Sequence, residues 1–141
     1  MPRLIQKVLI YATSARGLLV FSEPDFPEIS LQVPGGTMEA GELPSYSAKR
    51  EFEEETGLSA DVFRFLGQTE HLKTYQGEER FYRRFYFQTR LSGELSESWD
   101  HIEHFPSDGA PPILFRFEWL SPQTAQGRLG YDHGELLHRL K

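Results

Sequence analysis

The sequence contains no cysteine, and this absence excludes disulfides, cysteine-ligated zinc sites and thiol nucleophiles. Long hydrophobic runs are also missing. The longest run near the N-terminus, residues 8–12, is too short for a signal peptide or a membrane span. Basic residues are in the minority, with 15 Lys and Arg against 21 Asp and Glu and a net charge of −6. Because non-specific nucleic-acid binding depends on basic surface, we expect a cytoplasmic protein that binds neither membranes nor nucleic acid.

The chain is nevertheless well supplied with residues for a core. Its 141 residues match the commonest size of one domain, and 11 Phe, 6 Tyr and 2 Trp argue against disorder. We therefore predict a single domain over residues 1–141. Apolar and aromatic patterning predicts strands at residues 4–11, 17–21, 31–33, 62–66, 70–75, 80–91 and 114–120, helices at 44–56 and 132–140, and a long loop at 92–112. Strands on both sides of one well-marked helix predict an α/β domain with a mixed sheet.

The predicted helix at residues 44–56 carries an unusual group of acids. At 100° per residue, Glu51, Glu54 and Glu55 share an arc of about 100°, while Glu53 falls on the opposite side. Like charges at this spacing cost roughly 0.2–0.5 kcal/mol per pair, and acids in the last turn also oppose the helix dipole. A hard divalent cation would neutralise them, because Mg²⁺ and Mn²⁺ prefer carboxylate oxygens. The alternative is an exposed acidic helix end without a ligand.

The spacing around this helix resembles the Nudix box, G-x5-E-x7-R-E-U-x-E-E-x-G-U, in which U is a bulky apolar residue. Every specified position is filled, by Gly36, Glu42, Arg50, Glu51, Phe52, Glu54, Glu55, Gly57 and Leu58. The one departure is Phe52, where the family more often has Leu, Ile or Val, and it affects the packing of the helix rather than the carboxylates. The chain thus resembles the MutT-like Nudix hydrolases, which implies an α/β/α sandwich with a mixed sheet and a loop-helix-loop catalytic motif.

The resemblance also implies roles for individual residues. Glu51, Glu54 and Glu55 are the expected ligands of Mg²⁺ or Mn²⁺, together with a backbone carbonyl near Gly36. Arg50 is expected to orient a helix glutamate, and these four side chains form the expected catalytic set. Glu42 would brace the loop or bind the cation through water.

The motif leaves the general base open and does not include the substrate-binding residues. A box glutamate or a later carboxylate can activate the water; the later candidates are Glu97, Asp100, Glu103 and Asp108. Tyr75 stands where the family's dinucleoside polyphosphate hydrolases have a tyrosine. Tyr82 and Arg84 share one face of a predicted strand and could stack a base and bind a phosphate, although such a face is often core. Trp99 and His101 could bind a base or phosphate, or simply pack.

The expected reaction is the attack of water on phosphorus in a diphosphate linkage of a nucleoside diphosphate derivative or a related small nucleotide. The alternatives are a dinucleoside polyphosphate hydrolase, a nucleoside triphosphate pyrophosphatase and a nucleotide-binding Nudix module without turnover. The intact motif favours an enzyme. The sequence leaves open whether the chain forms a homodimer.

Overall fold

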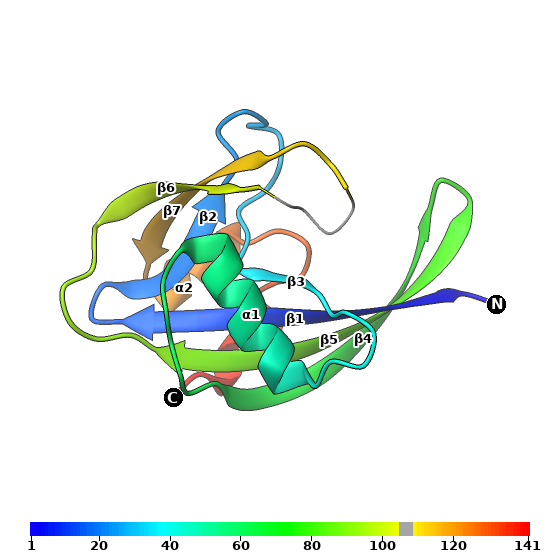
Figure 1. Cartoon of the computed structure of the whole chain (residues 1–141), viewed down its shortest axis with the longest axis horizontal. Helices are drawn as coiled ribbons and strands as arrows, with labels where there is room; N and C mark the ends of the chain where they lie inside the picture. The colour runs from blue at the N-terminus through cyan, green and yellow to red at the C-terminus, as the bar shows by residue number, and fades with distance from the viewer. Residues whose placement is uncertain (105–108) are drawn as a thin grey trace.

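The computed structural model describes residues 1–104 and 109–141 and consists of one mixed sheet with helices on both faces (Figure 1). Its elements are β1 (Arg3–Ser14), β2 (Gly17–Ser22), β3 (Gly35–Thr37), α1 (Pro44–Thr56), β4 (Arg64–Tyr75), β5 (Glu78–Arg90), β6 (Ser98–Glu103), β7 (Ile113–Leu120), α2 (Pro122–Arg128) and the 3₁₀-helix η1 (Leu137–Arg139). Within the described residues, no helix combines the length and hydrophobicity that a membrane crossing requires.

The strand order is β4-β5-β1-β2-β7-β6, and β3 pairs with the first half of β1. Strands β1 and β5 are parallel, and the other pairs are antiparallel, so the sheet is mixed as predicted. The β4–β5 hairpin and the start of β1 extend together beyond the rest of the sheet (Figure 1).

Strand β1 divides the core into two layers. Its side chains alternate between the faces of the sheet, so Val8 and Ile10 pack in the cluster beneath α1 while Leu9 and Tyr11 pack in the cluster on the α2 side. All four are at most 4% exposed. The expected sandwich of helix, sheet and helix is therefore confirmed.

Helix α1 begins and ends at the predicted residues. Pro44 occupies its first turn, and Gly57 closes it in the left-handed conformation, with φ 78° and its N–H donated to the Glu53 carbonyl. Leu43 precedes the helix without a side-chain cap, as expected of an apolar residue. Phe52 is fully buried and packs edge-on against Phe63, with ring centroids 5.9 Å apart. The bulkier Phe is therefore accommodated in the sheet-facing layer.

Three strand predictions need correction. Residues 31–33 form only isolated bridges, whereas the glycine-containing residues 35–37, for which no strand is predicted, form β3 against β1. The pieces at 62–66 and 70–75 belong to one strand, β4, which continues through an irregularity between Phe65 and Gly67. The predicted loop at 92–112 contains a strand, β6. Its polar composition does not indicate a strand, and pairing with β7 stabilises it.

The predicted closing helix at residues 132–140 is also wrong. This segment is a series of turns followed by η1, while the real C-terminal helix is the short α2. Tyr131 and Asp132 have φ of 56° and 60°, which a right-handed helix does not allow. The buried hydroxyl of Tyr11 donates to the His133 carbonyl and accepts the Leu136 N–H at 3.2 Å, so tertiary contacts hold this segment on the sheet.

Replacing Tyr11 by phenylalanine should therefore destabilise the protein by about 1–3 kcal/mol, because a buried N–H and a buried carbonyl lose their common partner. Urea unfolding should show a lower midpoint with an unchanged slope. Tyr46→Phe is the matched control, because Tyr46 is 63% exposed and should tolerate the change. Equal midpoints for the two variants would contradict the proposed role of the Tyr11 hydroxyl.

Candidate active site

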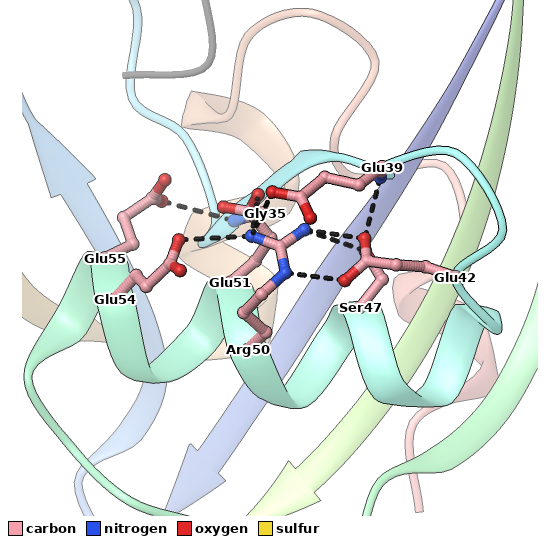
Figure 2. Close-up of polar contacts among 8 residues, drawn as sticks. All are labelled: Gly35, Glu39, Glu42, Ser47, Arg50, Glu51, Glu54 and Glu55. Carbon is pink, nitrogen blue, oxygen red and sulfur yellow. Dashed lines mark hydrogen bonds and ion pairs between the residues drawn. The ribbon is translucent and has the colours of Figure 1, made fainter. Parts of the chain in front are cut away.

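Three carboxylates from two elements meet on the α1 side of the sheet. Oxygen atoms of Glu51 and Glu55 from α1 and of Glu103 from β6 all lie within 4.8 Å of one another, a spacing that allows one cation to be bound by all three. Figure 2 shows Glu51, Glu54 and Glu55 on the same side of α1, toward Gly35 of β3. The expected glutamate face of α1 is therefore present, and Glu103 of β6 adds a carboxylate to it.

Strand β3 closes the opposite side of this carboxylate cluster, which we define as Glu51, Glu55 and Glu103. The Gly35 N–H donates to Glu55 at 3.2 Å. A Cβ atom at Gly36 would lie 2.2 Å from the Glu51 carboxylate, so any other residue there would displace the acid from its present position. Register holds β3 there, because Gly36 is opposite Val8 of β1. The glycine of the motif thus provides space at the carboxylates.

Burial makes the cluster electrostatically unfavourable without a counterion. Glu51 and Glu55 are 4% and 6% exposed. Burial raises the pKa of Glu51 to about 7 despite the neighbouring Arg50. Burial, followed by the charge of Glu103, raises the pKa of Glu55 well above its usual value. An all-oxygen donor set of this kind, with space left by Gly36, fits Mg²⁺ or Mn²⁺, which bind carboxylate oxygens.

Arg50 connects the helix glutamates to the preceding loop (Figure 2). It binds Glu42 with two hydrogen bonds, from Nε at 2.6 Å and from Nη2 at 2.7 Å. Its Nη1 donates to Glu51 at 3.0 Å and to Glu54 at 3.2 Å. Glu54 is 52% exposed along its side chain and lies outside the three-carboxylate group. The guanidinium therefore orients two glutamates at once, and Glu42 braces the loop in this structure.

Glu53, expected on the far side of the helix, is paired with Lys49 at 2.8 Å. It takes no part in the carboxylate cluster.

Strand β6 is fastened to the end of α1 by side-chain hydrogen bonds. Trp99 Nε1 donates to the Thr56 carbonyl at 3.0 Å, and His101 Nε2 lies 2.8 Å from the Glu54 carbonyl. These contacts satisfy carbonyls that a helix end leaves without intrahelical partners. Trp99 also stacks on Phe117 in the core at 5.1 Å. Both side chains therefore pack, and His101 is not among the residues that line the cleft described below.

The geometry of β6 distinguishes among the four candidate bases. Glu103 faces α1 because it lies on the same face of β6 as Trp99 and His101, at two-residue intervals. Asp100 points to the other face and binds Arg116 at 2.9 and 3.1 Å. Glu97 is exposed and precedes the strand. Asp108 lies outside the described residues. Of the described candidates, Glu103 alone reaches the carboxylate cluster.

An open cleft of about 1110 Å³ extends from the carboxylate cluster around β3 to the opposite face of β5. Tyr75, Tyr82 and Arg84, all singled out in the sequence, line this part of it. Arg84 is only 7% exposed and donates to Glu135 at 3.3 Å. The cleft thus brings the aromatic and basic candidates into one space with the acids, and leaves His101 outside.

Two residues contribute to this cleft in ways that the sequence does not predict. The sequence places Glu103 among the candidate bases but not among the cation ligands, because it predicts a loop over residues 92–112. The alternation of Trp99, His101 and Glu103 is the pattern that could have placed it. His133 lines the cleft from the C-terminal segment, and no local pattern indicates this.

Comparisons with known proteins agree with this geometry. A family model described as the NUDIX domain matches residues 2–140. A comparison with curated protein sequences gives no match.

Solved structures share the fold at low sequence identity. A MutT Nudix hydrolase from Burkholderia pseudomallei is 18% identical, with a TM-score of 0.71 and 99% of each chain covered. An Ap4A hydrolase from C. elegans is 16% identical, with a TM-score of 0.57, covering 99% of this chain and 96% of that one. The NUDIX domain of Shewanella oneidensis NrtR, complexed with ADP ribose, is 12% identical, with a TM-score of 0.64 and coverages of 99% and 86%. At these identities the likeness shows the fold alone.

The Glu42–Arg50 contact should make stability depend on acid pH. Hydrogen bonds from Arg50 lower the pKa of Glu42 from 4.5 to about 2, so the contact stabilises the folded state above pH 4.5 and is lost as pH falls toward 2. We expect Glu42→Gln to cost about 1–3 kcal/mol at neutral pH, with the difference from wild type shrinking across this window. Denaturant unfolding from pH 7 to pH 3 measures it.

Glu28→Gln, at an exposed position, is the control and should show no such trend. A stability difference for Glu42→Gln that stays constant over the whole pH range would contradict the assignment.

Proposed function

Because the chain belongs to the Nudix hydrolase family, we propose that it hydrolyses the diphosphate linkage of a nucleoside diphosphate derivative, with water attacking phosphorus. The observation that carries this proposal is the carboxylate cluster at one end of an open cleft. Gly36 lies beside the cluster, and a side chain at this position would collide with the Glu51 carboxylate. An acidic helix end without a ligand would expose its acids to water, because burying two carboxylates beside a third costs free energy.

Mg²⁺ or Mn²⁺ would be held by Glu51, Glu55 and Glu103, with a backbone carbonyl near Gly36. When bound, the cation offsets the negative charge that grows on the diphosphate oxygens in the transition state. Glu54 stays in the proposed catalytic set because Arg50 binds it together with Glu51.

The chain's own residues would position these groups and accept a proton. Arg50 keeps Glu51 and Glu54 in fixed orientations through a guanidinium that is itself anchored on Glu42. Among the later carboxylates, the position of Glu103 in the cluster supports it as a ligand or as the acceptor of the water's proton. Its strand is held on α1 by Trp99 and His101, which supports a positioning role for His101 in place of the expected substrate contact.

Tyr75, Tyr82 and Arg84 are proposed to bind the substrate, because they line the same cleft as the carboxylates. Dinucleoside polyphosphates are an alternative substrate class, in line with the name of the C. elegans relative in fold. Nucleoside triphosphates are another alternative. A nucleotide-binding module without turnover is less well supported here, because every specified position of the motif is filled.

Chelation and mutation of the cluster should both abolish hydrolysis. A panel of nucleoside diphosphate derivatives, dinucleoside polyphosphates and nucleoside triphosphates with Mg²⁺ or Mn²⁺ identifies the substrate, and ¹⁸O from water should appear in a phosphate product. Glu51→Gln and Glu55→Gln should reduce kcat by about 100-fold or more, because each removes charge that the transition state needs.

Glu53→Gln is the internal control, since Glu53 faces Lys49 and should matter little. Activity that survives exhaustive chelation would refute the metal assignment, and ¹⁸O in a sugar product would refute attack at phosphorus.

Metal binding should also reverse the order of stability between wild type and Glu55→Gln. Without metal, Glu55→Gln should melt at or slightly above the wild-type temperature, because neutralising one buried acid relieves its repulsion with Glu51 and Glu103. With excess Mn²⁺, wild type should gain about 2.7 kcal/mol at a hundred times the Kd, and the variant should lose most of that gain. Melting curves of both proteins, in chelator and in Mn²⁺, measure this. A variant that melts well below wild type in chelator, yet gains as much from Mn²⁺, would make Glu55 a structural residue.

A further inference from the structure

The sheet face opposite α1 carries two rows of basic residues along the cleft. Cross-strand register places Lys73 of β4, Arg80 of β5 and Arg3 of β1 in one row. Four residues along the strands, Thr69, Arg84 and Lys7 form the other row. We call these the distal row and the proximal row. All five bases line the cleft.

These bases are incompletely neutralised. In the distal row, Arg80 and Arg3 share Glu78, at 3.0 and 3.4 Å, and Lys73 lies 3.6 Å from Asp132. In the proximal row, Arg84 shares Glu135 with His71, and no ion pair of Lys7 occurs among the described residues. Like charges opposite one another on neighbouring strands are destabilising. Two basic rows on one face of a chain with net charge −6 therefore favour an anionic ligand.

Unused donors mark the proximal row as a binding site. Arg84 is 7% exposed, and its Nε has no hydrogen-bond partner; neither has Thr69 Oγ1, its cross-strand neighbour. His133 also lines the cleft, and its Nδ1 accepts the Val33 N–H at 3.2 Å, which leaves the proton on Nε2. Burial and then the charge of Arg84 lower the pKa of His133 to about 3, so it stays a neutral donor.

The proximal row adjoins the carboxylate cluster. Lys7 pairs with Thr37 of β3, directly beside the Val8–Gly36 pair. An anion at this row thus shares one cleft with the proposed metal site. The diphosphate that is cleaved is the anion expected there.

The distal row lies about 13 Å farther along the strands, at about 3.3 Å per residue. The row between them holds His71, Tyr82 and Ile5, and His71 is paired with the Glu135 carboxylate at 2.9 Å. Tyr82 and Ile5 offer an aromatic ring and an apolar side chain instead of positive charge. A continuous polyphosphate would leave its middle charges against these two residues. The pattern instead matches a ligand that is anionic at both ends with a ring system between.

We propose that the distal row binds a second phosphate group of the substrate, so that the substrate is a nucleoside diphosphate derivative whose nucleoside carries a further phosphate monoester. This inference rests on the proposed function for the identity of the first anion. The distal row supplies the charge, and Arg80 is held in place over the Tyr75 ring at 4.8 Å.

Binding of small nucleotides tests the proposal without turnover, because nucleotides that lack a diphosphate linkage are not cleaved. Calorimetry at physiological salt should show adenosine 2′,5′-bisphosphate or adenosine 3′,5′-bisphosphate binding about tenfold or more tighter than AMP. The combined change Arg80→Gln and Lys73→Gln should reduce this ratio to about one while leaving AMP binding unchanged. Arg83→Gln is the matched control, because Arg83 lies on the same strand but on the opposite face, paired with Glu70 at 3.1 Å.

The outcomes separate the inference from the proposed function. Equal affinities of wild type for AMP and both bisphosphates would overturn it, as would an equal loss of the ratio in Arg83→Gln. Tripolyphosphate binding as tightly as the bisphosphates would assign the face to polyphosphate, and an affinity that grows with the length of an oligoribonucleotide would assign it to RNA. A retained preference for a bisphosphate, with no hydrolysis of any diphosphate substrate, would refute the proposed function and leave the second phosphate site in place. In the turnover arm, kcat/KM should be higher for 2′-phospho-ADP-ribose or an equivalent 3′-phosphorylated substrate than for its unphosphorylated counterpart.

Discussion

Repulsion among Glu51, Glu55 and Glu103 is the constraint on which the site depends, because their oxygens lie within 4.8 Å in surroundings that raise the pKa of the two helix acids. Such an arrangement costs free energy, so the surrounding structure has to hold it in place. The fully buried Phe52 anchors α1 on the sheet, and Arg50 supplies positive charge on the exposed side. The acids are therefore pre-positioned by packing before any ligand arrives.

The same strand serves both ends of the cleft. On one edge of β1, Val8 and Lys7 pair with β3, which closes the carboxylate cluster through Gly36. On the other edge, parallel pairing with β5 aligns the bases of β1 with Arg80 and Arg84. Because side chains alternate along a strand, β1 can support the acidic site from one face and the basic rows from the other. This division gives the cleft an acidic end and a basic end without mutual neutralisation.

Substrate choice in this architecture depends on the face that the motif does not include. In the proposed function the motif residues carry out the attack on a diphosphate, whereas the cleft beyond β3 is lined by the β4–β5 hairpin and the C-terminal turns. These turns contribute Tyr131 and His133 to the cleft, and the buried Tyr11 hydroxyl keeps them on the sheet. A hydrogen bond in the core thereby holds one wall of the cleft in place.

Local sequence patterns predict α1, its termini and the side of the helix on which Glu51, Glu54 and Glu55 lie, because helix caps and helical periodicity are local properties. They also predict that the sheet is mixed. Tertiary structure decided the rest: whether Glu103 joins the acids depends on β6 pairing with β7, and which bases face one another depends on strand register. Pairing partners and register are set by contacts between segments distant in sequence, which composition and periodicity within one segment do not encode.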